Sequence, residues 1–330
     1  MRNSRTGEVN NRIIEFENMK KIAIISIAAL MSISVFAQSN NDGHNLALKV
    51  VVEEMVEPFP ATAKLQVENK LNALLTKNGI ASMDYLGQFF ITARATPLTK
   101  DVLPGPPMQI AETMDFTFYI ADYYNQIIFS TASVTAKGVG TSDAKSYMDA
   151  IKKINLNSPA LTKFVEEGRV KIIKYYNEQA DKIILKARAL AKQHDYEQAL
   201  FLVQTIPSEC DRYADAIAVG NEIYQEYVDY LCDVNLAAAK MAWVSGQNSK
   251  AAEEAGQYLG LIYPEAKCYA EAEALYAEIK GKVLDDWHFE MKRYQDGVDL
   301  ELARIHSWRD VGVAYGQGQQ PTTTNIGFIR

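Results

Sequence analysis

Residues 110–137 read IAETMDFTFYIADYYNQIIFSTASVTAK, and this stretch sets the expected fold of the first part of the chain. Apolar and polar residues alternate on both sides of a short polar segment, Asp122–Gln126. Such alternation is typical of half-buried strands, and a short connection between two of them predicts an antiparallel hairpin. We therefore expect strands over 110–121 and 127–137.

The flanking sequence extends this hairpin into a small sheet covered by helices. Upstream, the patterns predict a strand over 46–56, a helix over 61–78, a strand over 89–93 and a proline-rich turn over 103–107. Downstream, Gly138-Val-Gly140-Thr-Ser142 leads into a helix with Ser142 as its N-cap. The glycine pair is interpreted as a tight strand-to-helix turn, with an anion site at the helix N-terminus as the alternative. The order β-α-β-β-β-α predicts an α/β sandwich over residues 38–158, with a mainly antiparallel sheet.

Beyond Ser158-Pro159 we expect an all-α domain, so the chain as a whole belongs to the α+β class. Small residues stand twelve positions apart in two places, at Ala187 and Ala199 and again at Ala239 and Ala251. With a turn between the members of each pair, these segments resemble tetratricopeptide repeats. The resemblance implies helical hairpins over residues 159–281, with one extra helix per hairpin because the two copies are 52 residues apart.

The last part of the chain is expected to form one long amphipathic helix over 282–315, followed by a flexible tail over 316–330. Its near-heptad stripe includes Trp287, Met291, Tyr294 and Trp308. Two interpretations remain open: the stripe packs on the preceding helices, or the helix is an interaction arm for a partner or a second copy.

Residues 19–37 have the pattern of a secretory signal peptide: two lysines, an uncharged apolar run and small residues before the cut. Fifteen helical residues span only about 22 Å, which is short of the roughly 30 Å hydrocarbon core. We expect cleavage after Ala37, and residues 1–18 are interpreted as an upstream extension. No cysteine stands near the cleavage site, so we do not expect a lipoprotein, and we expect no membrane span after removal of the leader.

Composition narrows the classes of function. With 48% hydrophobic residues and 23% charged residues, the 330-residue chain is neither disordered nor a disulfide-framework miniprotein. A net charge of −7 argues against nucleic acid as a partner, since binding a phosphate backbone needs a basic surface. Among Cys210, Cys232 and Cys268, an oxidising compartment allows one disulfide. We expect three small buried residues, with a Cys210–Cys268 bond as the alternative.

The sequence contains no motif that indicates catalysis. The metal motifs HExxH and CxxC and the nucleophile motif GxSxG do not occur. The best cluster of ionisable residues, Asp285, Asp286, His288 and Glu290, is interpreted as a solvated helix face. We therefore expect no catalytic residues, no cofactor and no metal site.

The first half of the chain also resembles a domain of bacterial envelope lipoproteins of the CsgG-like and LpoB-like families. The features that match are the strand-helix start, the hairpin with its Asp122 turn, and Gly138-x-Gly140-x-Ser142 before a helix. The lipidation cysteine and the long membrane-crossing hairpins of the secretion channel have no counterpart. The leader and the whole chain resemble secreted proteins of Bacteroides-type bacteria, which implies a periplasmic or outer-membrane-associated location.

Three hypotheses for function follow from these observations. The first is a non-enzymatic adaptor or scaffold that binds other proteins of the cell envelope, since helical arrays present extended binding surfaces. The second is a homo-oligomeric structural envelope protein that assembles through the helix carrying Trp287 and Trp308. The third is an envelope hydrolase that uses Asp285, Asp286, His288 and Glu290.

Overall fold

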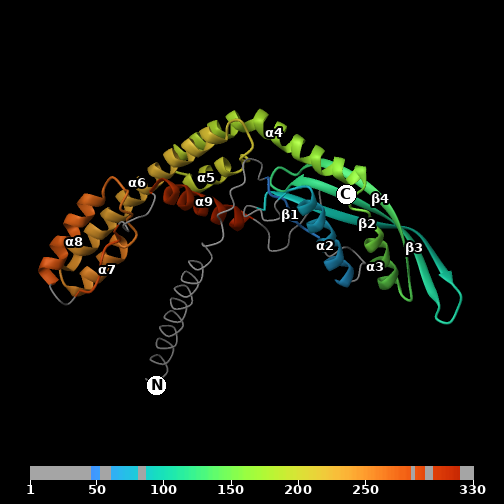
Figure 1. Ribbon diagram of the computed structural model, residues 1–330. Coiled ribbons are helices and arrows are strands. Elements are labelled where there is room, and N and C mark those ends of the chain that lie inside the picture. Colours follow the sequence, from blue (N-terminus) through green and yellow to red (C-terminus); the bar gives the residue numbers. More distant parts are fainter. Residues whose placement is uncertain (1–45, 53–60, 81–86, 284–286, 294–299, 320–330) are drawn as a thin grey trace, which may run out of the picture. The chain divides into compact units, whose positions relative to one another are not determined.

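The computed structural model describes residues 46–52, 61–80, 87–283, 287–293 and 300–319. Within these ranges the chain forms a mixed four-stranded sheet and eight helices, which confirms the α+β class (Figure 1). The expected signal peptide, residues 19–37, and the upstream extension lie outside the described residues.

The sheet has the strand order β1-β2-β3-β4, with bounds β1 (Lys49–Val50), β2 (Phe89–Leu103), β3 (Gln109–Asp122) and β4 (Ile127–Gly140). The expected hairpin is confirmed, because β3 and β4 pair antiparallel with Phe116 opposite Val134. Strand β2 is longer than expected and pairs with β3 as far as Leu103. Strand β1 covers two residues of the expected 46–56 and pairs parallel with β2.

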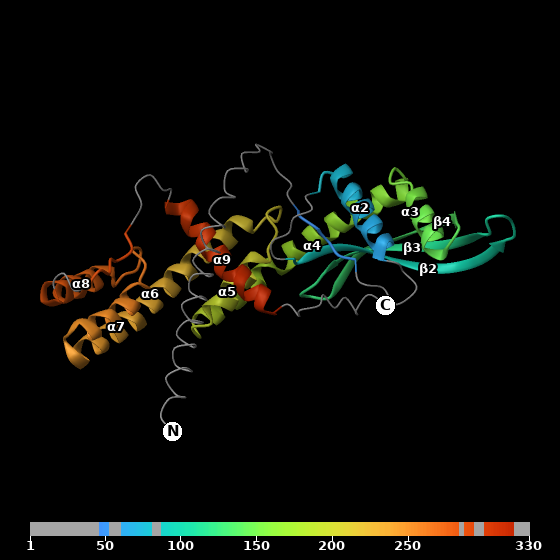
Figure 2. The ribbon, with the colours of Figure 1, turned by 90° about the horizontal axis from the view of Figure 1, so that it is seen from below.

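One face of the sheet is covered by helices, and the other carries mostly polar side chains. Met114, Phe116 and Phe118 are buried toward α2 (Ala61–Lys77), α3 (Asp143–Lys153) and the first half of α4 (Pro159–Ala191). Figure 2 shows α2 and α3 side by side on the sheet. The alternate residues of β3, such as Thr117, are half-buried on the open face, where the Thr117 hydroxyl lies 3.1 Å from that of Ser133 in β4.

The glycines before α3 allow that helix to lie directly on β4. A Cβ at Gly138 would lie 1.8 Å from the backbone oxygen of Ser146, and one at Gly140 would lie 2.5 Å from the Ser146 nitrogen. Ser142 is the N-cap, and its hydroxyl accepts a hydrogen bond from the backbone N–H of Lys145. Close packing therefore accounts for the glycine pair, as the tight-turn interpretation expects.

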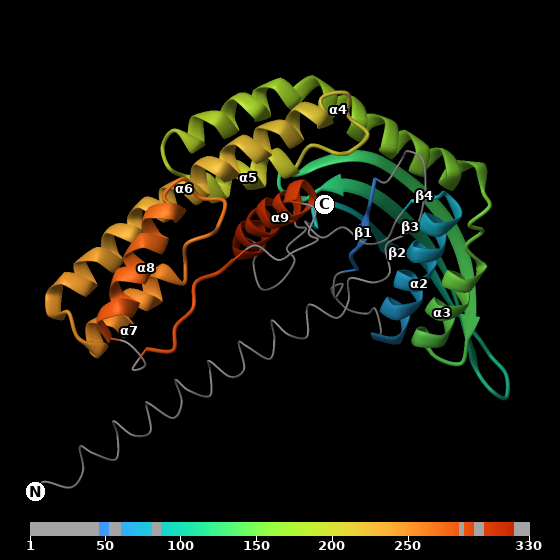
Figure 3. The ribbon, with the colours of Figure 1, turned by 60° about the vertical axis from the view of Figure 1, so that its left-hand side comes forward.

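The remaining helices are α5 (Tyr196–Gln204), α6 (Tyr213–Gly246), α7 (Ser249–Leu259), α8 (Tyr269–Val283) and α9 (Leu300–Gln319). Helix α4 packs on α5, and α6 packs on α7 (Figure 3). The four alanines of the two expected pairs are all buried: Ala187, Ala199, Ala239 and Ala251. Small side chains at these positions let the helices of each pair approach closely.

Helices α6 and α8 also begin with similar sequences. Residues 213–223 read YADAIAVGNEI and residues 269–279 read YAEAEALYAEI, a shift of 56 positions. Three of the apolar positions that match are buried in both helices: Ala216 and Ala272, Val219 and Leu275, Ile223 and Ile279.

The expected single helix over 282–315 is wrong. Helix α8 ends at Val283, residues 287–293 are not helical, and α9 begins at Leu300. The reason lies in Trp287 and Phe289, which both contact Gly256 of α7. Residues two positions apart reach one surface in an extended chain but point to opposite sides of a helix.

The expected interaction stripe is buried within the protein. Trp287 and Met291 pack on the helical core, and Trp308 lies over Gly220 of α6, where a Cβ would come within 2.8 Å of the indole. Tyr294 lies outside the described residues. These tryptophans therefore anchor the C-terminal region on the preceding helices and do not form a protruding arm.

The alternative considered for the cysteines, a Cys210–Cys268 bond, is wrong, because Cys268 is bonded to Cys232, with their Cα atoms 6.0 Å apart. Cys210 is buried as a free thiol. Cys210 precedes α6 and Cys268 precedes α8, so the two hold similar places in successive segments and do not face each other. Cys232 lies within α6, on the side that packs against the start of α8.

Candidate functional site

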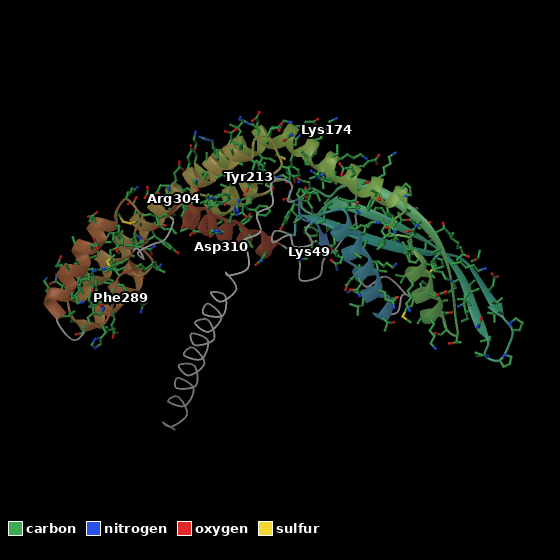
Figure 4. The ribbon with its side chains drawn as sticks, viewed as in Figure 1. Lys49, Lys174, Tyr213, Phe289, Arg304 and Asp310 are labelled. Carbon is green, nitrogen blue, oxygen red and sulfur yellow. A yellow bond between two sulfur atoms is a disulfide. The ribbon has the colours of Figure 1, made fainter. Side chains whose placement is uncertain are left out.

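A pocket of about 590 Å³ lies where the start of β2, the α5–α6 connection and α9 meet. We call it the junction pocket. Phe89, Ile206 and Trp308 contribute to a largely apolar lining, and Tyr213 and Asp310 add polar groups (Figure 4). Mostly apolar pockets with a few polar groups are the usual form of ligand and peptide sites.

Hydrogen bonds hold the walls of the junction pocket together. Gln204 Nε2 donates to the backbone oxygens of Trp308 at 3.2 Å and Arg309 at 2.7 Å. Gly312 makes this approach possible, because a Cβ there would lie 2.1 Å from Gln204 Nε2. The Arg309 guanidinium donates to the hydroxyl of Tyr213. Helix α9 is therefore tied to both α5 and α6.

One residue of the pocket lining, Glu209, has an unsatisfied carboxylate oxygen. Its Oε2 accepts a hydrogen bond from the Ser208 hydroxyl at 3.2 Å, whereas its buried Oε1 has no hydrogen-bond partner among the described residues. A buried acceptor without a partner costs about 1–3 kcal/mol.

Beside the pocket, a buried polar network joins the sheet to the helices. The carboxylate of Asp122 accepts hydrogen bonds from the Tyr176 hydroxyl at 2.5 Å and from the backbone and side-chain nitrogens of Asn125 at 3.0 and 2.9 Å. Gln88 Nε2 donates to the Tyr176 oxygen at 2.5 Å and to the backbone oxygen of Thr205 at 3.1 Å. The network therefore links β2, the β3–β4 turn, α4 and the end of α5.

Burial raises the pKa of the Tyr176 hydroxyl far above its ordinary value of 10, and the nearby Asp122 carboxylate raises it further. Tyr176 therefore remains a hydrogen-bond donor at any physiological pH. This fixed proton suits a structural connection between the two parts of the chain.

The β2–β3 turn forms an exposed apolar surface, which we call the hairpin tip (Val102–Met108). Val102, Leu103 and Met108 are 56%, 43% and 55% exposed. Three prolines stiffen the turn, and the tip contains no charged residue. Figures 1 and 3 show the turn extending past α3. The expected proline-rich turn over 103–107 is thus present at the end of a longer hairpin than the sequence indicates.

The residues considered for hydrolysis are only partly described. His288 and Glu290 are exposed, and Asp285 and Asp286 lie outside the described residues. No group of three or more metal-ligating side chains gathers in the part of the chain that the structure describes. In that same part, no helix has the length and apolar character needed to cross a bilayer.

Sequence reasoning missed the junction pocket and the Asp122 network. The pocket lining includes residues from Leu46 to Val313, the network joins segments up to 117 positions apart in the bond from Gln88 to Thr205, and neither set shares a local pattern. Comparison with known proteins adds no assignment, because no family model, curated protein or solved structure matches the chain.

Proposed function

We propose that this protein is a non-enzymatic adaptor or scaffold of the cell envelope, exported after removal of residues 19–37. In this proposal residues 38–158 form an α/β sandwich that docks on one envelope protein. The helices over 159–281 form a tetratricopeptide-like array that binds another. Neither activity requires a cofactor or a metal.

The exposed hairpin tip is the observation that carries this proposal. Exposed groups of large apolar side chains, such as Val102, Leu103 and Met108, often mark interaction sites on proteins. The tip is also pre-ordered, because proline fixes backbone φ, and a pre-ordered surface loses little entropy on binding. Its lack of charge favours an apolar cleft on the partner.

Two further observations support the proposal. The Cys232–Cys268 disulfide suits an exported protein, because disulfides persist in oxidising compartments and are rare in the cytosol. The Asp122 network fixes the sheet to the helices, and a fixed geometry lets a scaffold hold two partners in a defined arrangement.

The test is affinity capture of the tagged full-length chain from cells of the source bacterium after chemical crosslinking. We expect the wild-type protein to retain a specific envelope protein, and Val102→Glu/Met108→Glu to lose it. Thr131→Glu/Ser133→Glu, two exposed substitutions on the open sheet face, is the matched control and should retain the partner. Equal capture by both variants would contradict the role of the tip.

A further inference from the structure

Helix α6 carries a second exposed apolar surface, which we call the α6 seam. It consists of Tyr230, Val234, Ala237, Met241 and Val244. The spacing of four, three, four and three residues places all five on one side of the helix and is the heptad pattern of a coiled coil. Tyr230, Val234, Met241 and Val244 are 39%, 49%, 75% and 69% exposed.

The opposite side of α6 already has its intramolecular partners. Cys232 is bonded to Cys268 at the start of α8, and the Trp243 indole donates to Glu278 of α8 at 3.0 Å. The face of a helix that points away from its intramolecular partners is usually charged or polar. Here it is apolar instead, over about 21 Å of helix.

The seam begins where the α4–α5 turn ends. The ring of His194, in that turn, stacks on Tyr230 with 4.9 Å between centroids, and the ring of Tyr196 lies 5.7 Å from the same ring. From Val234 to Val244 the seam residues are exposed.

We propose that the α6 seam binds the same seam of a second copy of this chain, with the two helices antiparallel and the two-fold axis at Ala237. In this register Tyr230 faces Val244 of the second copy, Val234 faces Met241, and Ala237 faces itself. Large residues meet at both ends, and alanine at the centre permits close approach of the helices.

Charge favours the antiparallel direction. Asp233 and Lys240 border the seam on one side, and both are exposed. An antiparallel pair brings Asp233 of each copy opposite Lys240 of the other, whereas a parallel pair brings Asp233 opposite Ala238. Within the chain, Asp233 pairs with Lys267 at 2.8 Å and Lys240 with Glu271 at 2.5 Å, which holds both charges at the edge of the seam.

Cysteine crosslinking tests the register. Cys232 and Cys268 are bonded and Cys210 is buried, so the exported chain provides a low thiol background. Under mild oxidation we expect Ala237→Cys to form a covalent dimer. Ser245→Cys should stay monomeric, because antiparallel packing separates the two copies of this position by about 24 Å along the axis. Crosslinking of both variants would overturn the antiparallel register, and crosslinking of neither would overturn the interface.

Light scattering tests the interface itself. We expect the exported chain to dimerise at micromolar concentration, and Met241→Glu to weaken dimerisation at least tenfold. The control is Leu185→Glu, an equally exposed apolar residue of α4 outside the seam. Asp233→Lys and Lys240→Asp should each weaken the dimer, and the double variant should restore it. A wild-type chain that stays monomeric at micromolar concentration would overturn the proposal. The same conclusion would follow if the chain dimerised only after residues 320–330 had been removed.

This inference does not depend on the proposed function, because the seam and the hairpin tip lie on different elements. A dimer that captures no envelope protein would leave the seam intact and contradict only the adaptor proposal.

Discussion

Tyr176→Phe is the substitution that most sharply tests the connection between sheet and helices. The change removes one oxygen and leaves the ring in place. The lost hydroxyl donates to Asp122 at 2.5 Å, whereas Asp122 keeps two bonds from Asn125 and Gln88 keeps the Thr205 oxygen. The change therefore removes three hydrogen bonds: the one that the hydroxyl donates to a buried carboxylate, and the two that it accepts from the side-chain amides of Gln88 at 2.5 Å and Asn125 at 2.8 Å. The bond to the carboxylate sets the scale of the loss, about 1.5–3 kcal/mol, because both amides keep a second acceptor. We expect the midpoint of thermal unfolding to fall by roughly 4–8 °C.

Urea unfolding followed by circular dichroism measures this change, with Tyr119→Phe, a half-buried tyrosine of β3, as the control. The raised pKa of Tyr176 gives a second signature. Above about pH 10 an unfolded tyrosine loses its proton while native Tyr176 keeps it, so its contribution to stability falls as the pH rises. The gap between wild type and Tyr176→Phe should narrow between pH 9 and about 11. A variant within about 0.5 kcal/mol of wild type at pH 8 would refute the reasoning.

Three further predictions concern packing, the disulfide and acid stability. Gly138→Ala should prevent stable folding, because the new Cβ would lie 1.8 Å from a backbone oxygen of α3. Gly281→Ala, with no atom within 4 Å, should raise the thermal midpoint slightly. Cys232→Ser should cost about 4 kcal/mol in urea unfolding, as expected for a loop of this length, whereas Cys210→Ser should cost far less. The pKa of the Asp149 carboxyl lies below its ordinary value of 3.8, because the carboxylate accepts hydrogen bonds from the Lys153 side chain, one turn later, and from the backbone N–H of Val139. The contribution of Asp149 to stability is thus present above pH 4 and is lost as the pH falls through its lower pKa in the folded protein. The loss of unfolding free energy caused by Asp149→Asn at pH 7 should therefore vanish in strong acid.

Local patterns predicted the parts of the fold that depend on local chemistry. Alternation over 110–137 identified the β3–β4 hairpin because one face of each strand is buried. Ser142 was identifiable as an N-cap, because a side-chain oxygen before a helix satisfies a free backbone N–H. Buried alanines at 187 and 199 likewise mark helices that approach closely.

The errors come from tertiary contacts that override local patterns. The outer half of β2 is exposed on both faces from Thr96 to Leu103, so it lacks the alternation that identifies a strand. The heptad spacing of Trp287 and Met291 indicated a helix. However, Trp287 and Phe289 both pack against Gly256, and this contact favours an extended chain. The cysteine pairing and the Asp122 network depend on which helices meet, and spacing alone does not encode this.

Photo-crosslinking tests most directly whether the hairpin tip binds another envelope protein. The most direct measurement places a photo-crosslinking amino acid at Met108 of the full-length chain, irradiates intact cells and identifies the adducts by mass spectrometry. We expect one dominant envelope protein at position 108 and no such adduct from the same probe at the exposed Lys163 of α4. Lipid adducts alone, or identical adducts from both positions, would contradict it.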